Sequence, residues 1–193
     1  MKHTILTNLI LVSTFFLSSC NKDNKSAADD TGDLPKSAVP AELAGKYWHA
    51  GSFSMTQYSN YDGSYAGQAF EISTGYKFAA DGTAEQYFYW TKTTTYCREQ
   101  ILGYRKGTVV FDSNNKTFKF YAASGNYRRY NNCGSSQSPD YGVKKQYGSE
   151  DLYPAYTAEH SNWSIVQENG KMIWRITYPD NTTLDYSRAE EPE

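Results

Sequence analysis

The stretch from residue 69 to residue 91 constrains the fold more than any other part of the chain. From Phe70 to Phe78, apolar side chains and one threonine alternate with polar residues and glycine. A period of two is typical of a β-strand that is buried on one face. A three-residue Ala80-Asp81-Gly82 turn with a left-handed glycine would place Phe88 and Trp90 on the face of Phe78. We therefore expect a β-hairpin with one apolar face.

Later segments repeat this pattern. Residues 103–112 and 117–122 predict a second hairpin, with Val109, Phe111, Phe118 and Phe120 on its apolar face. Asn169-Gly170 is a strong type I′ turn signal, and it predicts that Ile165 pairs with Trp174 and Trp163 with Ile176. A turn at residues 179–181 would add a third strand, pairing Trp174 with Tyr186.

Composition agrees with a sheet-rich protein. Of the 193 residues, 16% are aromatic and 18 are tyrosine, which suits half-exposed β-structure and excludes a largely disordered chain. We expect one all-β domain of seven to nine strands, because no segment has a strong helical pattern. A meander of hairpins avoids exposed edges best by closing on itself. An up-and-down barrel of about eight strands is therefore the first expectation, and a two-sheet sandwich is the alternative.

The N-terminus has the features of a processed segment. A short charged start precedes the mostly apolar residues 5–17, which are too few to span a bilayer. The segment ends in Leu17-Ser18-Ser19-Cys20 and resembles a bacterial lipoprotein signal. The resemblance implies cleavage before Cys20, acylation of this cysteine with chains such as palmitate, and anchoring to a membrane. An ordinary signal peptide with a chance cysteine is the alternative.

These features divide the chain into four parts. Residues 1–19 are the predicted signal peptide, and residues 20–42 are the lipidated cysteine followed by a flexible, polar tether. Residues 43–188 are the expected barrel domain, and residues 189–193 are an acidic tail. Asn21 follows the cysteine and favours the outer membrane of the bacterial envelope, again by resemblance. We expect a monomer.

The two remaining cysteines, Cys97 and Cys133, suggest a disulfide. An exported protein folds in an oxidising compartment, where an even number of thiols usually pairs. Free thiols or metal ligands are the alternative, although neither cysteine has a histidine or second cysteine at ligand spacing.

A second resemblance concerns the start of the domain. Gly45-Lys46-Tyr47-Trp48, ahead of a β-meander and behind a lipoprotein signal, looks like the opening of lipocalin-like envelope proteins. The resemblance implies that Trp48 packs at the closed end of the barrel, with Arg175 or Arg188 lying over it. The spacing from glycine to tryptophan is one residue longer than usual, so Tyr47 is the other candidate for this role. The resemblance implies a fold and a pocket, without naming a ligand.

Several classes of function are disfavoured. The chain has no nucleophile-elbow, zinc-protease, phosphate-loop or Cys-x-x-Cys motif, and we expect no enzyme, no metal and no cofactor. His49 and His160 are the only histidines after processing, and each is more simply a half-buried polar residue than a catalyst. A formal net charge of −2 without a basic patch argues against nucleic-acid binding.

Two functions remain as expectations. The first is a lipid-anchored barrel that binds a small amphipathic or hydrophobic ligand inside. The second is a module with a solid core that binds glycan or protein through tyrosine-rich loops, since tyrosine and arginine favour recognition. Residues 56–67 and 124–149 are rich in turn-forming residues and tyrosine, and we expect each to be a long loop. The candidate loop residues for ligand contact are Tyr58, Tyr61, Tyr65, Tyr127, Arg128 and Tyr130.

Overall fold

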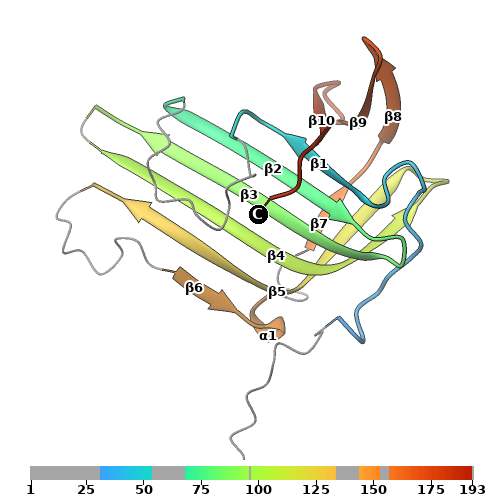
Figure 1. Cartoon of the computed structure of the whole chain (residues 1–193), viewed down its shortest axis with the longest axis horizontal. Helices are drawn as coiled ribbons and strands as arrows, with labels where there is room; N and C mark the ends of the chain where they lie inside the picture. Colours follow the sequence, from blue (N-terminus) through green and yellow to red (C-terminus); the bar gives the residue numbers. More distant parts are fainter. Residues whose placement is uncertain (1–30, 54–67, 96, 134–143, 153–156, 193) are drawn as a thin grey trace, which may run out of the picture.

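The computed structural model describes residues 31–53, 68–95, 97–133, 144–152 and 157–192. Within these ranges the chain forms ten strands and one helical turn (Figure 1). The elements in chain order are β1 (Lys46–Ala50), β2 (Phe70–Phe78), β3 (Thr83–Thr93), β4 (Arg98–Asp112), β5 (Thr117–Asn131), β6 (Lys144–Tyr147), α1 (Ser149–Leu152), β7 (Thr157–His160), β8 (Trp163–Glu168), β9 (Lys171–Thr177) and β10 (Thr183–Ala189).

All ten strands belong to a single antiparallel sheet, so the all-β prediction is confirmed. The strand order is β6-β5-β4-β3-β2-β1-β10-β9-β8, and β7 pairs with the same edge of β5 that β6 uses further along. The first strand therefore lies between β2 and β10, and it joins the N-terminal and C-terminal hairpins into one sheet.

The predicted closed barrel of about eight strands is wrong, and the sandwich alternative does not form either. The sheet curls until its two ends approach, but β8 pairs only with β9. Two hydrogen bonds bridge the gap: Trp163 donates from its backbone N to Lys116 O (3.1 Å) and from Nε1 to Thr117 O (3.2 Å). A two-residue link with left-handed Asn162 separates β7 from β8. The chain changes direction at this link, so β8 does not continue the pairing of β7 with β5.

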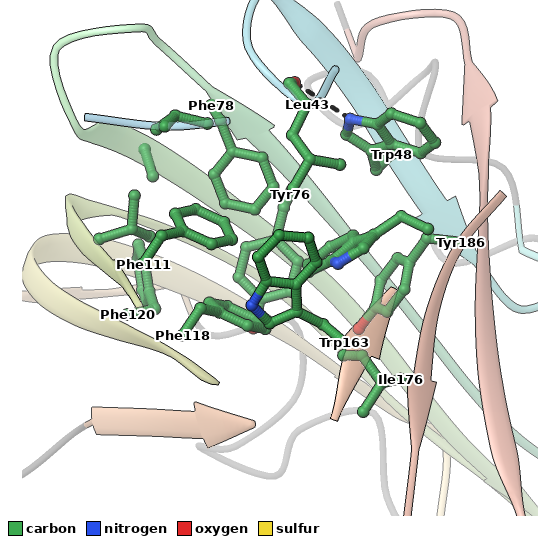
Figure 2. Packing of buried hydrophobic residues seen from close by; sticks show 14 of the residues in the cluster. Leu43, Trp48, Tyr76, Phe78, Phe111, Phe118, Phe120, Trp163, Ile176 and Tyr186 are labelled. Carbon is green, nitrogen blue, oxygen red and sulfur yellow. Dashed lines mark hydrogen bonds between the residues drawn. The ribbon is translucent and has the colours of Figure 1, made fainter. Parts of the chain in front are cut away.

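Aromatic side chains fill the concave side of the curled end (Figure 2). Trp174 is fully buried and lies 4.5 Å from Tyr186, 5.1 Å from Phe118 and 5.4 Å from Phe78, measured between ring centroids. Trp48 is also fully buried, and its Nε1 donates to Leu43 O (3.1 Å). Since the protein's own rings occupy this space, the curled end is a packed core.

The predicted turns and registers are confirmed. Phe78 pairs with Ala84 and Ile72 with Trp90, and Gly82 is left-handed with φ = 89°. Asn169 and Gly170 both have positive φ, as a type I′ turn requires, and Ile165 pairs with Trp174.

The single apolar face predicted for the central hairpin is only half buried. Tyr76 and Phe78 lie in the core, whereas Phe70 and Ile72 are each 59% exposed. The reason is the curl of the sheet: β8–β10 cover one end of β2 and leave the other end open (Figure 1).

Two further predictions about local order need correction. Residues 124–149 were expected to be a long loop, but β5 extends to Asn131, and β6 pairs with it over Gly125–Arg128. In the predicted tether, Ser37 N donates to Val109 O (3.0 Å), Thr108 Oγ1 donates to Pro35 O (2.7 Å), and Val39 is buried in the core. This part of the tether packs along β4 as an integral part of the domain.

Candidate functional site

An exposed apolar row crosses the open half of the sheet. Ile72 on β2 pairs with Trp90 on β3, Trp90 pairs with Ile101 on β4, and Ile101 pairs with Arg129 on β5. Paired residues point to the same face of a sheet, so these side chains lie side by side. We call Ile72, Trp90 and Ile101 the apolar row; it lies on the same face as the aromatic core and ends at a guanidinium group.

Next to the apolar row, the Phe88 ring lies between Gly103 and the Arg105 guanidinium. Phe88 pairs with Gly103, and its ring lies where a side chain at this glycine would be, so any larger residue would clash with the ring. The guanidinium carbon of Arg105 lies 4.3 Å from the Phe88 ring centroid, in cation–π contact. Gly103 therefore lets Phe88 lie flat on the sheet, and Phe88 supports Arg105.

A buried glutamine fixes the orientation of Arg105. Arg105 Nη1 donates to Gln86 Oε1 (2.9 Å), and Gln86 Nε2 donates to the hydroxyl of Tyr76 (2.6 Å). Gln86 is only 5% exposed, and Tyr76 lies in the aromatic core. The core therefore positions a cation of the open face through one side-chain amide.

Two tyrosines from neighbouring strands form the far side of the site. The rings of Tyr127 on β5 and Tyr147 on β6 are 5.3 Å apart, and Lys145 Nζ lies 5.2 Å from the Tyr147 ring centroid. Burial, followed by the neighbouring Tyr127, raises the pKa of Tyr147 above its ordinary value. The Tyr147 phenol is therefore neutral at physiological pH.

Together these side chains line a surface depression of about 360 Å³, which we call the aromatic groove. This volume is within the range of small-molecule sites. The residues that line it are Phe88, Glu99, Ile101, Arg105, Tyr127, Arg129 and Tyr147.

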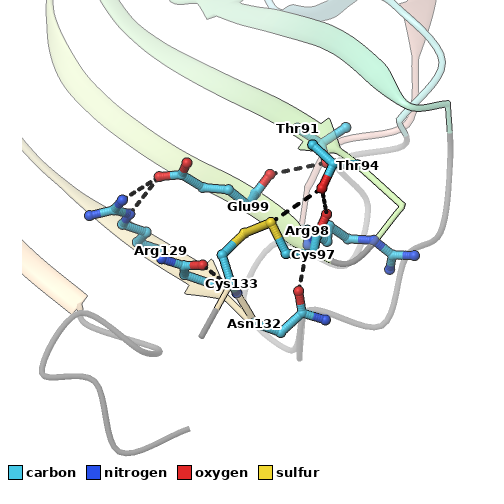
Figure 3. Close-up of a disulfide and its surroundings, with 9 residues drawn as sticks. Thr91, Thr94, Cys97, Arg98, Glu99, Arg129, Asn132 and Cys133 are labelled. Atoms are coloured by element: carbon cyan, nitrogen blue, oxygen red, sulfur yellow. Dashed lines mark hydrogen bonds and ion pairs between the residues drawn. A yellow bond between two sulfur atoms is a disulfide. The ribbon is translucent and has the colours of Figure 1, made fainter. Parts of the chain in front are cut away.

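Glu99 and Arg129, which both line the groove, form an ion pair next to the disulfide (Figure 3). Arg129 donates to one oxygen of Glu99, Oε1, from both Nε (2.8 Å) and Nη2. Cys97 and Cys133 are bonded as predicted, immediately beyond this pair, and join the ends of β4 and β5. The cross-link keeps the strands that carry Glu99 and Arg129 in register.

The opposite face of the same strands is buried. Tyr89 and Leu102 are fully buried there, in a second cluster with Tyr47, Phe53 and Tyr87. Gln100 Nε2 donates to the Tyr89 hydroxyl (2.9 Å). Only the groove face of β2–β5 therefore exposes large apolar side chains in this half of the described sheet.

The predicted contact residues on β5 lie on different faces of the sheet. Tyr127 lines the groove, but Arg128 and Tyr130 point to the opposite face, because they pair with the buried residues Leu102 and Gln100. All three belong to β5, and the prediction of a loop was wrong for them. Tyr58, Tyr61, Tyr65 and the predicted lipidation residue Cys20 lie outside the described residues.

The closed barrel end at which Trp48 was predicted to pack does not form, and Arg175 does not lie over Trp48. Trp48 is fully buried, with its ring 6.4 Å from Trp174. Arg175 instead forms a two-bond ion pair with Asp185 (2.7 and 2.6 Å), and Glu168 adds a third contact at 2.8 Å. Its side chain alternates with that of Trp174 and therefore points away from the core. The other candidate, Arg188, is directly opposite Trp48 in the β1–β10 ladder and is exposed.

Of the residues that line the groove, only Tyr127 was among the predicted contacts. The others were not, among them Phe88 as a ring that supports a cation, Arg105 and Arg129. The alternation of β4 and β5 carried a usable signal, because the two arginines share the parity of Ile101 and Tyr127 once both strands are extended. This signal was missed because residues 124–149 were assigned to a loop.

Acid–base and metal chemistry have little support among the described residues. No cluster of three or more potential metal ligands occurs there. Burial lowers the pKa values of both His49 and His160, and His160 stacks on Phe118 with centroids 4.7 Å apart. His160 therefore acts as a neutral packing residue.

Neither a protein-family model nor a curated protein matches the chain. Within the described residues, no helix has the length and apolar character needed to cross a membrane.

Proposed function

We propose that this protein is a non-catalytic binding protein of the bacterial envelope, lipid-anchored through Cys20, that holds a small amphipathic ligand on the open face of β2–β5. The observation that carries the proposal is the exposure of Phe70 and Ile72, each 59% accessible, next to a groove of aromatic and charged side chains. Soluble proteins rarely leave such contiguous apolar surface uncovered unless it binds something.

The position of the ligand follows from the packing. The curled end is filled by its own rings, so the proposal places the ligand on the sheet surface and not inside a barrel. The apolar row supplies a surface for hydrocarbon, and the groove supplies polar groups at one end of it. A site with this division suits a molecule that has one apolar and one polar end.

The anchor is a separate part of the proposal. It is supported by the Leu17-Ser18-Ser19-Cys20 sequence and by the oxidising compartment that the Cys97–Cys133 disulfide favours. Cells grown with labelled palmitate should incorporate label into the wild-type chain and not into Cys20→Ser. Label in both, or in neither, would contradict the lipidation.

The ligand-binding proposal is tested by tryptophan fluorescence. Trp48, Trp163 and Trp174 are buried, whereas Trp90 is only partly buried and lies in the apolar row, so it should report on binding. The probes are single-chain amphiphiles below their micellar concentrations. Ile72→Ser should weaken binding about tenfold, because it removes roughly 1.4 kcal/mol of apolar contact. The matched control is Tyr178→Ser, at an exposed aromatic residue that directly follows β9 and lies outside β2–β5.

The expected outcome is a loss with Ile72→Ser and none with Tyr178→Ser. Equal affinity in the wild type and Ile72→Ser would reject the open face as the binding site. The alternative of a glycan- or protein-binding module depends on Tyr58, Tyr61 and Tyr65, and the same protein can be screened against glycans to test it.

A further inference from the structure

We infer that the ligand is an anion, whose acidic group is bound at the Arg105–Arg129 end of the aromatic groove while its apolar part lies along the apolar row. This inference rests on the proposed function, and it adds the charge of the ligand and the direction in which the ligand lies.

Cations outnumber carboxylates on the open face. The four rows of paired residues that cross β2–β6 on this face contain Lys92, Arg105, Arg129 and Lys145, and Glu99 is the one carboxylate in these rows. Asp151 of α1 lies near Tyr147 and is a second acidic group beside the groove. The whole chain has a formal net charge of −2, so this excess of cations is local. A face with clustered positive charge attracts and orients an anionic ligand.

The cations also lie where a ligand would arrive. The Arg105 guanidinium covers the Phe88 ring, and Lys145 Nζ lies over the Tyr147 ring. A neutral sugar or sterol that stacked on either ring would have to displace a cation, whereas an acidic group can contact the cations directly. The arrangement therefore favours an anion over a neutral ring compound.

Arg105 is held in place before any ligand binds. Its hydrogen bond to Gln86, itself bonded to Tyr76 in the core, restricts the guanidinium to one orientation. A preorganised cation loses less conformational freedom on binding, which strengthens the contact.

Glu99 competes with an anionic ligand for the hydrogen-bond donors of Arg129. Its Oε1 accepts both hydrogen bonds from Arg129, in a pair whose side chains are each partly exposed. A ligand carboxylate that contacts Arg129 competes with Glu99 for the same donors. Removing the charge of Glu99 should therefore strengthen binding of an anion and leave binding of a neutral amphiphile unchanged.

The length of the row sets the size of the probe. Three interstrand spacings of about 4.8 Å separate Ile72 from Arg129, which is about 14 Å and close to the length of an extended ten-carbon chain. The test uses decanoate, 1-decanol and decyltrimethylammonium, which differ in charge at one chain length. It uses the full-length, oxidised chain carrying Cys20→Ser, so that no acyl group is attached.

We expect decanoate to bind at least about tenfold more tightly than the neutral and cationic probes, with a preference that falls as salt rises. Arg129→Gln should bring decanoate within about twofold of decanol without changing the affinity for decanol, and Arg129→Lys should retain part of the preference. Glu99→Gln should raise the affinity for decanoate roughly twofold to fivefold.

The chain offers a matched control on the same strand. Lys119 and Glu159 form an exposed ion pair of 3.0 Å, so Lys119→Gln and Glu159→Gln make the same changes of charge away from the groove. Both should leave the affinity for decanoate unchanged. Thermal melts of every variant show that each one is folded.

The outcomes separate the two proposals. Equal binding of decanoate and decanol, both weakened by Ile72→Ser, would overturn the inference of an anion and leave the proposed function intact. A charge preference that survives Arg129→Gln would also overturn it. No binding of any probe, or binding that Ile72→Ser does not weaken, would overturn the proposed function and with it this inference.

Discussion

Gln86 Oε1 accepts a hydrogen bond of 2.9 Å from Arg105 Nη1, and this contact links the aromatic core to the open face of the sheet. The amide has a second partner, because its Nε2 donates to the buried Tyr76 hydroxyl at 2.6 Å. Both ends of one buried side chain are therefore satisfied, one by the core and one by a cation of the groove.

Replacing Gln86 with Leu should destabilise the fold and weaken anion binding together. The change leaves the Tyr76 hydroxyl without this partner, which costs about 1–3 kcal/mol, and it releases Arg105 from its fixed orientation. Urea unfolding of Gln86→Leu, Tyr76→Phe and the double variant measures the coupling. If the stability losses of the two single variants simply add, the amide does not link the residues as described.

The apolar row should contribute little to stability. Ile72 is 59% exposed, so Ile72→Ser should change the free energy of unfolding by less than about 0.5 kcal/mol. Trp174→Ala, in the core, should cost about 3–5 kcal/mol. Chemical denaturation of both variants checks the contrast. A large loss with Ile72→Ser would mean that the open face is needed for folding and is not kept free for a ligand.

The disulfide should stabilise the domain and the end of the groove. Cys97 and Cys133 are separated by 36 residues, and a cross-link of this span contributes about 4 kcal/mol in the chain-entropy treatment. Cys97→Ser/Cys133→Ser should therefore lower the midpoint of urea unfolding. Hydrogen exchange should increase first near Arg98 and Asn132, whose backbones are hydrogen-bonded beside the bridge. Unchanged exchange at these amides would show that the ladder holds the strand ends without the bridge.

Stability should decrease on mild acidification. Burial lowers the pKa of His160 in the folded protein, so the unfolded chain, with a pKa of about 6.5, binds the proton more tightly. The stabilisation is present above about pH 6.5 and is lost as the pH falls below it. Melting temperatures at about pH 7.5 and pH 5.5 should differ by a few degrees, and the difference should shrink in His160→Gln. His49 has a pKa shift of the same sign and supplies the remainder.

Local sequence patterns predicted the strands because their causes are local. Alternation in β2, the Asn169-Gly170 turn and left-handed Gly82 led to registers that the structure has, such as Ile165 opposite Trp174. The disulfide was predictable because it needs only two cysteines in an oxidising compartment. Residues 124–131 were missed because glycine and asparagine are weak strand formers, and only pairing with β4 makes them a strand.

The sequence by itself determined that this chain forms antiparallel hairpins with one aromatic side, since a period of two and turn chemistry act over a few residues. Only the tertiary structure decided that the sheet stays open, that Phe70 and Ile72 remain exposed, and that Arg105 and Arg129 meet beside Phe88 and Tyr127. The physical reason is that curvature and coverage of a sheet depend on contacts between distant strands. Whether an apolar face becomes core or binding surface is therefore settled by what packs against it.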